Sequence, residues 1–103
     1  MSVTGGGVGV GPGPGVADVG VTIKTFQFKP KEVAAHAGDR IVVANEDGIQ
    51  HSLTADQAGG AGPLFDTGFI GKGEEGSFAA PAPGTYAFHC ERHPSMTGVL
   101  KVE

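Results

Sequence analysis

Residues 84–96 read GTYAFHCERHPSM, and this stretch indicates both the type of fold and the place of its chemistry. Pro83 directly precedes this stretch, and the pair Pro83-Gly84 is a turn signal. Tyr86, Phe88 and Cys90 then occupy alternate positions, so their side chains share one side of a strand while His89 faces the other. The stretch therefore predicts a strand that ends at a cysteine and passes into a loop.

The rest of the chain repeats this kind of short segment. The apolar positions 21 and 23 continue at Phe26 and Phe28 with a slip in parity, which predicts a bulge. Residues 55–73 show little periodicity and are predicted to form a long connection. Alternating apolar residues predict strands near 21–28, 32–36, 41–45, 51–53, 76–80, 84–90 and 100–102. Short strands separated by Gly and Pro turns indicate an all-β fold, an antiparallel β-sandwich.

The N-terminal part of the chain has a different composition. Between Gly5 and Gly20, eight of sixteen residues are glycine, and Pro12 and Pro14 lie among them. Such a run buries little apolar surface, so we expect residues 1–18 to form a flexible tail or linker and residues 19–103 to form the folded domain. A linker of this kind suits a domain that is tethered to a membrane upstream of the tail.

Composition excludes several classes of function. The 103 residues suffice for one domain, and the formal net charge of -4 without a basic run argues against nucleic acid as a partner. No stretch is long and apolar enough to cross a bilayer. The single cysteine cannot form an intrachain disulfide, and by itself it is either a small buried hydrophobe or a thiolate. Its neighbours must decide between these two interpretations.

Three potential metal ligands follow one another in the loop after the predicted strand. Cys90, His93 and Met96 recur at every third position, which places a thiolate, an imidazole and a thioether on one side of a tight loop. Soft sulfur ligands together with imidazole select copper, and two histidines, one cysteine and a distant methionine are the ligands of electron-transfer copper sites. This spacing therefore predicts one copper ion per chain.

The second histidine must come from the remaining three in the chain. His89 is expected to face away from Cys90, and His36 has no polar partner in view. His51 begins a predicted strand just after a glycine turn, and we choose it. Structural zinc sites fit less well because methionine is not a normal zinc ligand, and a c-type haem would need a second cysteine. A Cys/His nucleophile would need an orienting Asn or Asp and a substrate pocket.

With these residues in place, the chain resembles the cupredoxin family of type 1 blue-copper proteins, and within it the amicyanin branch. The resemblance rests on residues 84–90, on the short Cys90-x-x-His93-x-x-Met96 spacing, and on the five residues between Asn45 and His51. It extends from about residue 21 to the C-terminus. The chain departs from the family pattern at Arg92, where proline is usual, and at Ser95, where a bulky apolar residue is usual.

The resemblance implies a Greek-key β-sandwich and a role for each site residue. His51, Cys90 and His93 would be the strong copper ligands, with Met96 as the weak axial ligand. Three further residues would support them: Gln50 with a carbonyl on the other axial side, Asn45 with hydrogen bonds that tie the His51 loop to the Cys90 loop, and Ser52 with an N–H directed to the Cys90 sulfur. An apolar electron port is expected around Pro94, with Pro63, Leu64 and Phe65.

The resemblance also implies a function, outer-sphere electron transfer between redox partner proteins by a monomer outside the cytoplasm, in a periplasm or at a cell surface. No substrate bond is made or broken, so we expect no enzymatic activity. A copper carrier or store is the alternative, although such proteins favour Met- or His-rich ligation and this chain has only two methionines. A fragment of a multicopper oxidase or nitrite reductase would need more histidines around Cys90.

The predicted tail leads to a first test. Deletion of residues 2–14 should leave the visible spectrum and the thermal unfolding of the copper-loaded protein nearly unchanged, because few buried contacts are expected there. A large loss of stability would show instead that the tail packs as an integral strand.

Overall fold

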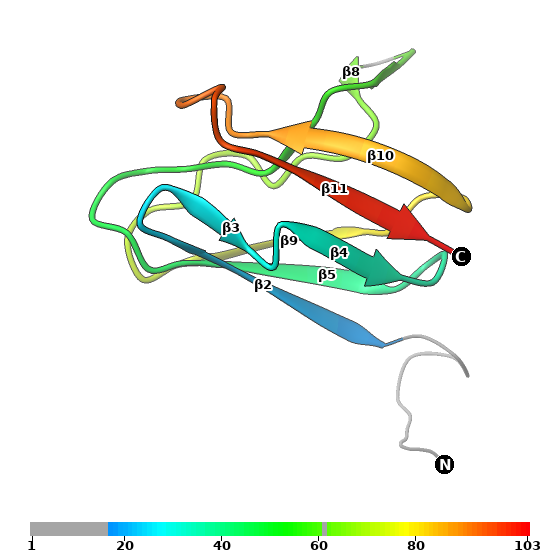
Figure 1. Cartoon of the computed structure of the whole chain (residues 1–103), viewed down its shortest axis with the longest axis horizontal. Helices are drawn as coiled ribbons and strands as arrows, with labels where there is room; N and C mark the ends of the chain where they lie inside the picture. Colours follow the sequence, from blue (N-terminus) through cyan, green and yellow to red (C-terminus); the bar gives the residue numbers. More distant parts are fainter. Residues whose placement is uncertain (1–16, 61) are drawn as a thin grey trace.

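The computed structural model describes residues 17–60 and 62–103, so the predicted tail lies outside the described residues apart from its last two positions. Two four-stranded sheets pack against each other as a sandwich (Figure 1). One sheet has the order β4 (Glu32–Ala35), β11 (Thr97–Val102), β10 (Gly84–His89) and β6 (Thr54–Ala55). The other has the order β3 (Gln27–Lys29), β2 (Asp18–Lys24), β5 (Arg40–Asn45) and β9 (Glu75–Ala79). In the described part of the chain, no helix is long and apolar enough to cross a membrane.

The β-sandwich predicted from the sequence is confirmed, but its sheets are mixed rather than antiparallel throughout. β2 pairs in parallel with β5, and β4 pairs in parallel with β11. Both parallel pairs arise because the chain changes sheet between β3 and β4, so that neighbouring strands are not always joined by hairpins. Alternation of apolar residues marks the buried face of a strand and carries no information on the direction of its partner.

The parity slip near Phe26 is a tight turn, and the predicted bulge is wrong. β2 and β3 form an antiparallel hairpin in which Lys24 pairs with Gln27, and only Thr25 and Phe26 lie between them. Both turn residues have positive φ, at 51° and 57°. Positive φ at both central residues is characteristic of the type I′ turn, which two-residue hairpins favour because it matches the twist of the strands. The turn between β2 and β3 lies at the same end of the sandwich as the loop after β10 (Figure 1).

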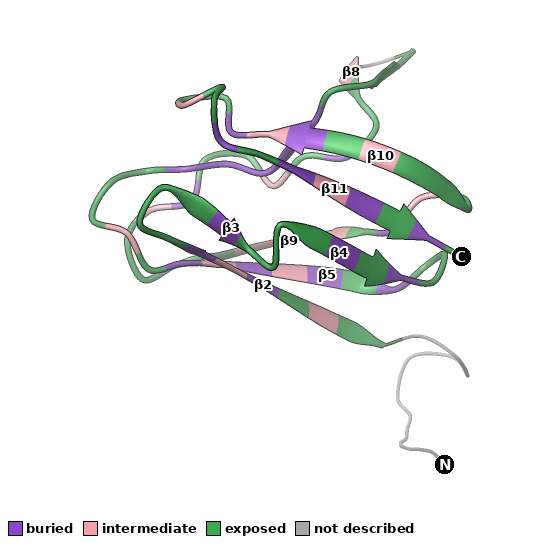
Figure 2. Ribbon diagram, viewed as in Figure 1, coloured by how far each residue is buried: buried purple, intermediate pink, exposed green. Residues whose placement is uncertain are grey.

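The core lies between the sheets and follows the predicted alternation of side chains. In β5, Ile41, Val43 and Asn45 are buried while the residues between them are half-buried (Figure 2). Phe28 and Phe88, from opposite sheets, meet edge to face with ring centroids 4.9 Å apart. Each fully buried side chain of this size contributes about 1.5–3 kcal/mol through the hydrophobic effect. The core thus fixes the two sheets against each other and gives the loops at their ends a rigid base.

The predicted long connection contains short paired segments. β7 (Ala58–Gly59) and β8 (Gly62–Pro63) form a small hairpin. On either side of it the chain runs back along itself, with bridges between Thr54 and Asp66 and between His51 and Ile70. These antiparallel bridges hold the segment around His51 in an extended conformation at the end of the sandwich.

The contact between β10 and β11 leads to a second prediction. A Cβ atom on Gly98 would lie 2.5 Å from the Phe88 ring and 2.7 Å from the Lys31 carbonyl oxygen. Gly98→Ala should therefore lower the free energy of unfolding by about 1–3 kcal/mol through overpacking, measured by urea denaturation. Gly20→Ala in β2 is the matched control, because nothing lies within 4 Å of the added methyl group. Equal stabilities of the two variants would contradict this account.

Candidate metal centre

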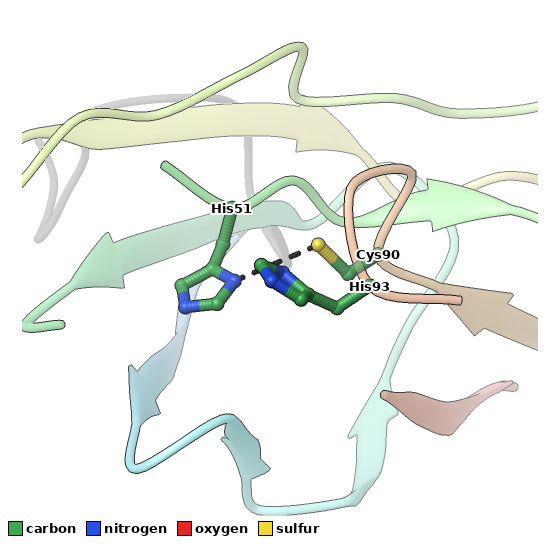
Figure 3. Close-up of side chains that lie close together, drawn as sticks. All are labelled: His51, Cys90 and His93. Carbon is green, nitrogen blue, oxygen red and sulfur yellow. Dashed lines mark hydrogen bonds between the residues drawn. The ribbon is translucent and has the colours of Figure 1, made fainter. Parts of the chain in front are cut away.

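Three potential ligands from two distant parts of the chain converge at one end of the sandwich. Cys90 directly follows β10, His93 lies in the loop that leads to β11, and His51 lies on the segment between β5 and β6. One ligand atom from each side chain lies within 4.8 Å of the other two. Figure 3 shows the two imidazoles and the thiol turned toward one another. The structure therefore brings together three of the four metal ligands predicted from the sequence.

In each of the two imidazoles, Nδ1 has no oxygen partner among the described residues. His51 uses Nε2 to contact Asp47 at 2.9 Å, while its Nδ1 lies 3.6 Å from Cys90 Sγ. His93 Nδ1 is buried and has no hydrogen-bond partner among the described residues. A buried polar atom without a partner is costly unless something else binds it. Two imidazole nitrogens beside a fully buried cysteine fit a copper ion.

The fourth predicted ligand, Met96, lies at the end of the same loop. It is buried, at 5% exposure. Two backbone hydrogen bonds close the loop: Cys90 N–H donates to the Met96 carbonyl at 3.0 Å, and Met96 N–H donates to the His93 carbonyl at 2.8 Å. These hydrogen bonds keep the loop from Cys90 to Met96 tightly closed.

Ser52 connects the His51 segment to the Cys90 loop. Its N–H lies 3.4 Å from Cys90 Sγ, and its Oγ accepts a hydrogen bond from Glu91 N–H at 3.0 Å. The sequence had assigned the connection between these loops to Asn45, and that expectation is wrong. The buried Asn45 amide group donates to the Ile49 and Ile70 carbonyls instead. Both acceptors adjoin the His51 segment, since Ile49 precedes it in the chain and Ile70 pairs with His51.

Two neighbours of the centre were missed by sequence reasoning. Asp47 contacts the His51 imidazole, and Phe26 packs against both histidine rings. An acidic residue four positions before a histidine in a loop is a weak signal, and nothing in the sequence places Phe26 near either ring. Gln50 is exposed next to His51, and the role of its carbonyl stays a prediction.

The predicted apolar port is in part wrong. Phe65 is buried and stacks on Phe78 with ring centroids 4.6 Å apart, so it belongs to the core. Leu64 is exposed beside β8. Among the described residues, three further large apolar side chains are exposed: Phe26, Ile49 and Phe69. Phe26 contacts both histidine rings of the site. Ile49 lies two positions before His51, and Phe69 directly precedes Ile70, which pairs with His51.

The other two histidines lie apart from the centre. His89 faces away from it, as predicted, and its ring nitrogens contact Asp56 and Glu91. His36 is mostly exposed, and it does have polar neighbours, Asp39 and Glu103 at 3.8 Å.

Two titratable groups near the centre have shifted pKa values. Partial burial opposes ionisation of Asp47, but N–H groups of Phe26 and Thr25 and the His51 ring donate to its carboxylate and lower its pKa. Hydrogen bonds to Asp56 and Glu91 raise the pKa of His89. Asp47 thus carries negative charge next to His51, and two further carboxylates surround the ring of His89.

Comparison with known proteins identifies the family. A family model described as copper binding proteins, plastocyanin/azurin family, matches residues 16–103. The chain belongs to this family. Both the predicted cupredoxin family and copper as its metal are therefore confirmed. Chloroplastic plastocyanin of Physcomitrium patens is 32% identical over 83 residues, which cover 73% of this chain and 49% of that protein. The chain thus spans about half the length of this relative.

Solved cupredoxin structures are similar in fold. An amicyanin mutant in its reduced Cu(I) form at pH 4 has a TM-score of 0.74 and 26% identity, covering 91% of this chain and 86% of that chain. A copper-containing nitrite reductase of Thermus scotoductus SA-01 has a TM-score of 0.72 and 27% identity. That match covers 84% of this chain but only 22% of the reductase, so it concerns one part of a larger protein.

The His89 contacts lead to a prediction on pH and stability. Because the folded pKa of His89 is raised, its contribution to stability is complete below its ordinary pKa of 6.5 and is lost as pH rises through the folded value. His89→Gln in the copper-loaded protein should therefore lower the melting temperature more at about pH 5.5, where the carboxylates remain ionised, than at about pH 9.

His36→Gln is the control for this experiment, because the His36 side chain is 72% exposed. An effect of His89→Gln that is equal at both pH values, or larger in alkali, would contradict the prediction.

Proposed function

We propose that this protein is a type 1 blue-copper protein that transfers single electrons between redox partner proteins. In this proposal His51, Cys90, His93 and Met96 hold one copper ion. The observation that carries it is the convergence of two imidazoles and a buried thiol, with His93 Nδ1 left without a partner among the described residues. Bound copper supplies a one-electron Cu(I)/Cu(II) couple.

The protein itself holds the ligand side chains in positions that change little when the site gains or loses an electron. Cys90 and His51 are fully buried, and each is attached to backbone held by paired strands or bridges. The two hydrogen bonds across the Cys90–Met96 loop restrict the remaining ligands. A donor to the cysteine sulfur, here Ser52 N–H, withdraws charge from it and tunes the potential.

His93 is the proposed route for electrons. It is half-buried, whereas His51 and Cys90 are at 0% exposure. Phe26 packs on its ring and is itself exposed, and Ile49 and Phe69 supply further exposed apolar side chains on neighbouring segments. We therefore assign the electron port to this end of the molecule, in place of the patch around Phe65.

We further propose that the chain has no enzymatic activity of its own. A catalytic second copper centre would need histidines with free ring nitrogens, but both nitrogens of His89 contact carboxylates. A copper carrier or store is the alternative, and the fully buried Cys90 and His51 argue against easy exchange of the metal. By analogy with the family we place the protein outside the cytoplasm, as a monomer. The Gln50 carbonyl and the Ser52 N–H would support the ligands, and Asn45 holds the segment that carries His51 through the Ile49 and Ile70 carbonyls.

The visible spectrum tests the proposed function. The copper-loaded protein should contain one copper per chain and show an intense blue Cu(II)–thiolate band, and Cys90→Ser should abolish that band. Ser95→Ala, in the same loop but outside the ligand set, should retain it. A blue Cys90→Ser protein, or preferential uptake of zinc when both metals are supplied, would refute the assignment. Rapid transfer of copper to an acceptor without a stable blue colour would favour the carrier.

A further inference from the structure

Phe26 occupies an unusual position next to the metal centre. Its ring lies edge-on to His51 and to His93, with centroid separations of 5.4 and 5.1 Å and interplanar angles of 87° and 83°. It is nonetheless 52% exposed, and its φ of 57° is in a region that bulky side chains rarely adopt. An exposed aromatic residue in a left-handed turn gains little from burial, so other contacts must hold it in place.

Asp47 provides these contacts. Its Oδ1 accepts the N–H of Thr25 at 2.7 Å, and its Oδ2 accepts the N–H of Phe26 at 2.9 Å. The same Oδ2 lies 2.9 Å from His51 Nε2. One carboxylate thus binds both amides of the turn and the ring of a metal ligand. Charge-assisted hydrogen bonds of this kind are about twice as strong as neutral ones.

A groove also adjoins Phe26. Its volume is about 300 Å³, and it is lined by the hairpin residues Phe26 and Phe28, by Lys31, and by Met96 with its neighbours Ser95 and Thr97. Phe26 both lines this groove and packs on the two imidazoles, and neither histidine is among the residues that line the groove. Lys31 gives the groove a positive charge, which favours small anions.

We propose that Phe26 caps the metal centre against small ligands from this groove, and that Asp47 is the positioning residue for both the cap and His51. The proposal rests on the proposed function, because it concerns the copper at this site. By accepting a hydrogen bond from His51 Nε2, Asp47 leaves Nδ1 free to face Cys90. By binding the two turn amides, it keeps the Phe26 ring over both histidines. An electron carrier needs no exchangeable ligand, and a cap prevents one from binding.

Two substitutions separate these roles. Phe26→Asn removes the ring but keeps the turn, because asparagine tolerates positive φ. Asp47→Asn keeps the shape of the side chain but replaces one carboxylate oxygen by an NH2 group. This group cannot accept the N–H hydrogen bonds that the carboxylate accepts in the wild type. Phe69→Ala is the control, since Phe69 is similarly exposed, at 57%, and is not among the aromatic contacts of the two histidines.

The first experiment measures access to the metal. Azide is added to the copper-loaded proteins at neutral pH, and the blue band and the electron paramagnetic resonance spectrum are recorded. The wild type and Phe69→Ala should not respond, whereas Phe26→Asn should start blue and change on addition of azide. Capture of copper by excess chelator should be about two- to tenfold faster in Phe26→Asn, as expected for the loss of aromatic edge contacts. In Asp47→Asn it should be about 10–100-fold faster.

The second experiment tests whether Asp47 acts through both partners. In the diamagnetic Cu(I) protein, the His51 Nε2 proton should exchange slowly with solvent in the wild type and in Phe26→Asn, and rapidly in Asp47→Asn. The double variant should respond to azide no more than Asp47→Asn alone if Asp47 controls access by holding Phe26.

The outcomes separate this inference from the proposed function. A blue Phe26→Asn protein that resists azide like the wild type would overturn the cap. Slow exchange of the His51 proton in Asp47→Asn would overturn the positioning role. A wild-type protein that is not blue with copper would overturn the proposed function itself, and with it the inference.

Discussion

The hydrogen bond from Ser52 N–H to the Cys90 sulfur joins the two halves of the metal centre, and the remaining geometry depends on it. The chain crosses from β5 in one sheet to β6 in the other, and His51 lies on this crossing. β6 then pairs with β10 just before Cys90. A shift of this pairing by one residue would turn His51 outward, because side chains alternate along an extended segment. The Ser52 hydroxyl, which accepts Glu91 N–H, holds the same register.

Around this contact the polar groups form one connected network. Asn45 ties the end of β5 to the Ile49 and Ile70 carbonyls, and its own Oδ1 accepts Asp47 N–H at 2.9 Å. Asp47 continues to the β2–β3 turn and to His51. Buried polar groups that are satisfied in this way make a site rigid, since moving one breaks several hydrogen bonds. A rigid site suits electron transfer because the ligands need not rearrange between oxidation states.

Family membership accounts for the architecture, and the loops at the end of the sandwich add the contacts around the centre. Phe26 reaches both histidines because two residues of positive φ make the hairpin turn, and Asp47 secures that turn. The likeness to part of a nitrite reductase shows that the fold is also used inside larger enzymes. In this chain both ring nitrogens of His89, the residue before Cys90, contact carboxylates and are therefore not free to bind a second metal ion.

The sequence by itself determined the strand before Cys90, the ligand spacing to His93 and Met96, and the buried faces of the strands, because each depends on residues close together in the chain. Choosing His51 needed comparison among the histidines. Only the tertiary structure decided the parallel pairings and the contacts of Asn45, Asp47 and Phe26. These depend on which loops meet at the end of the sandwich, and a carboxylate or an aromatic ring in a loop has no preferred partner until packing of the two sheets brings one within reach.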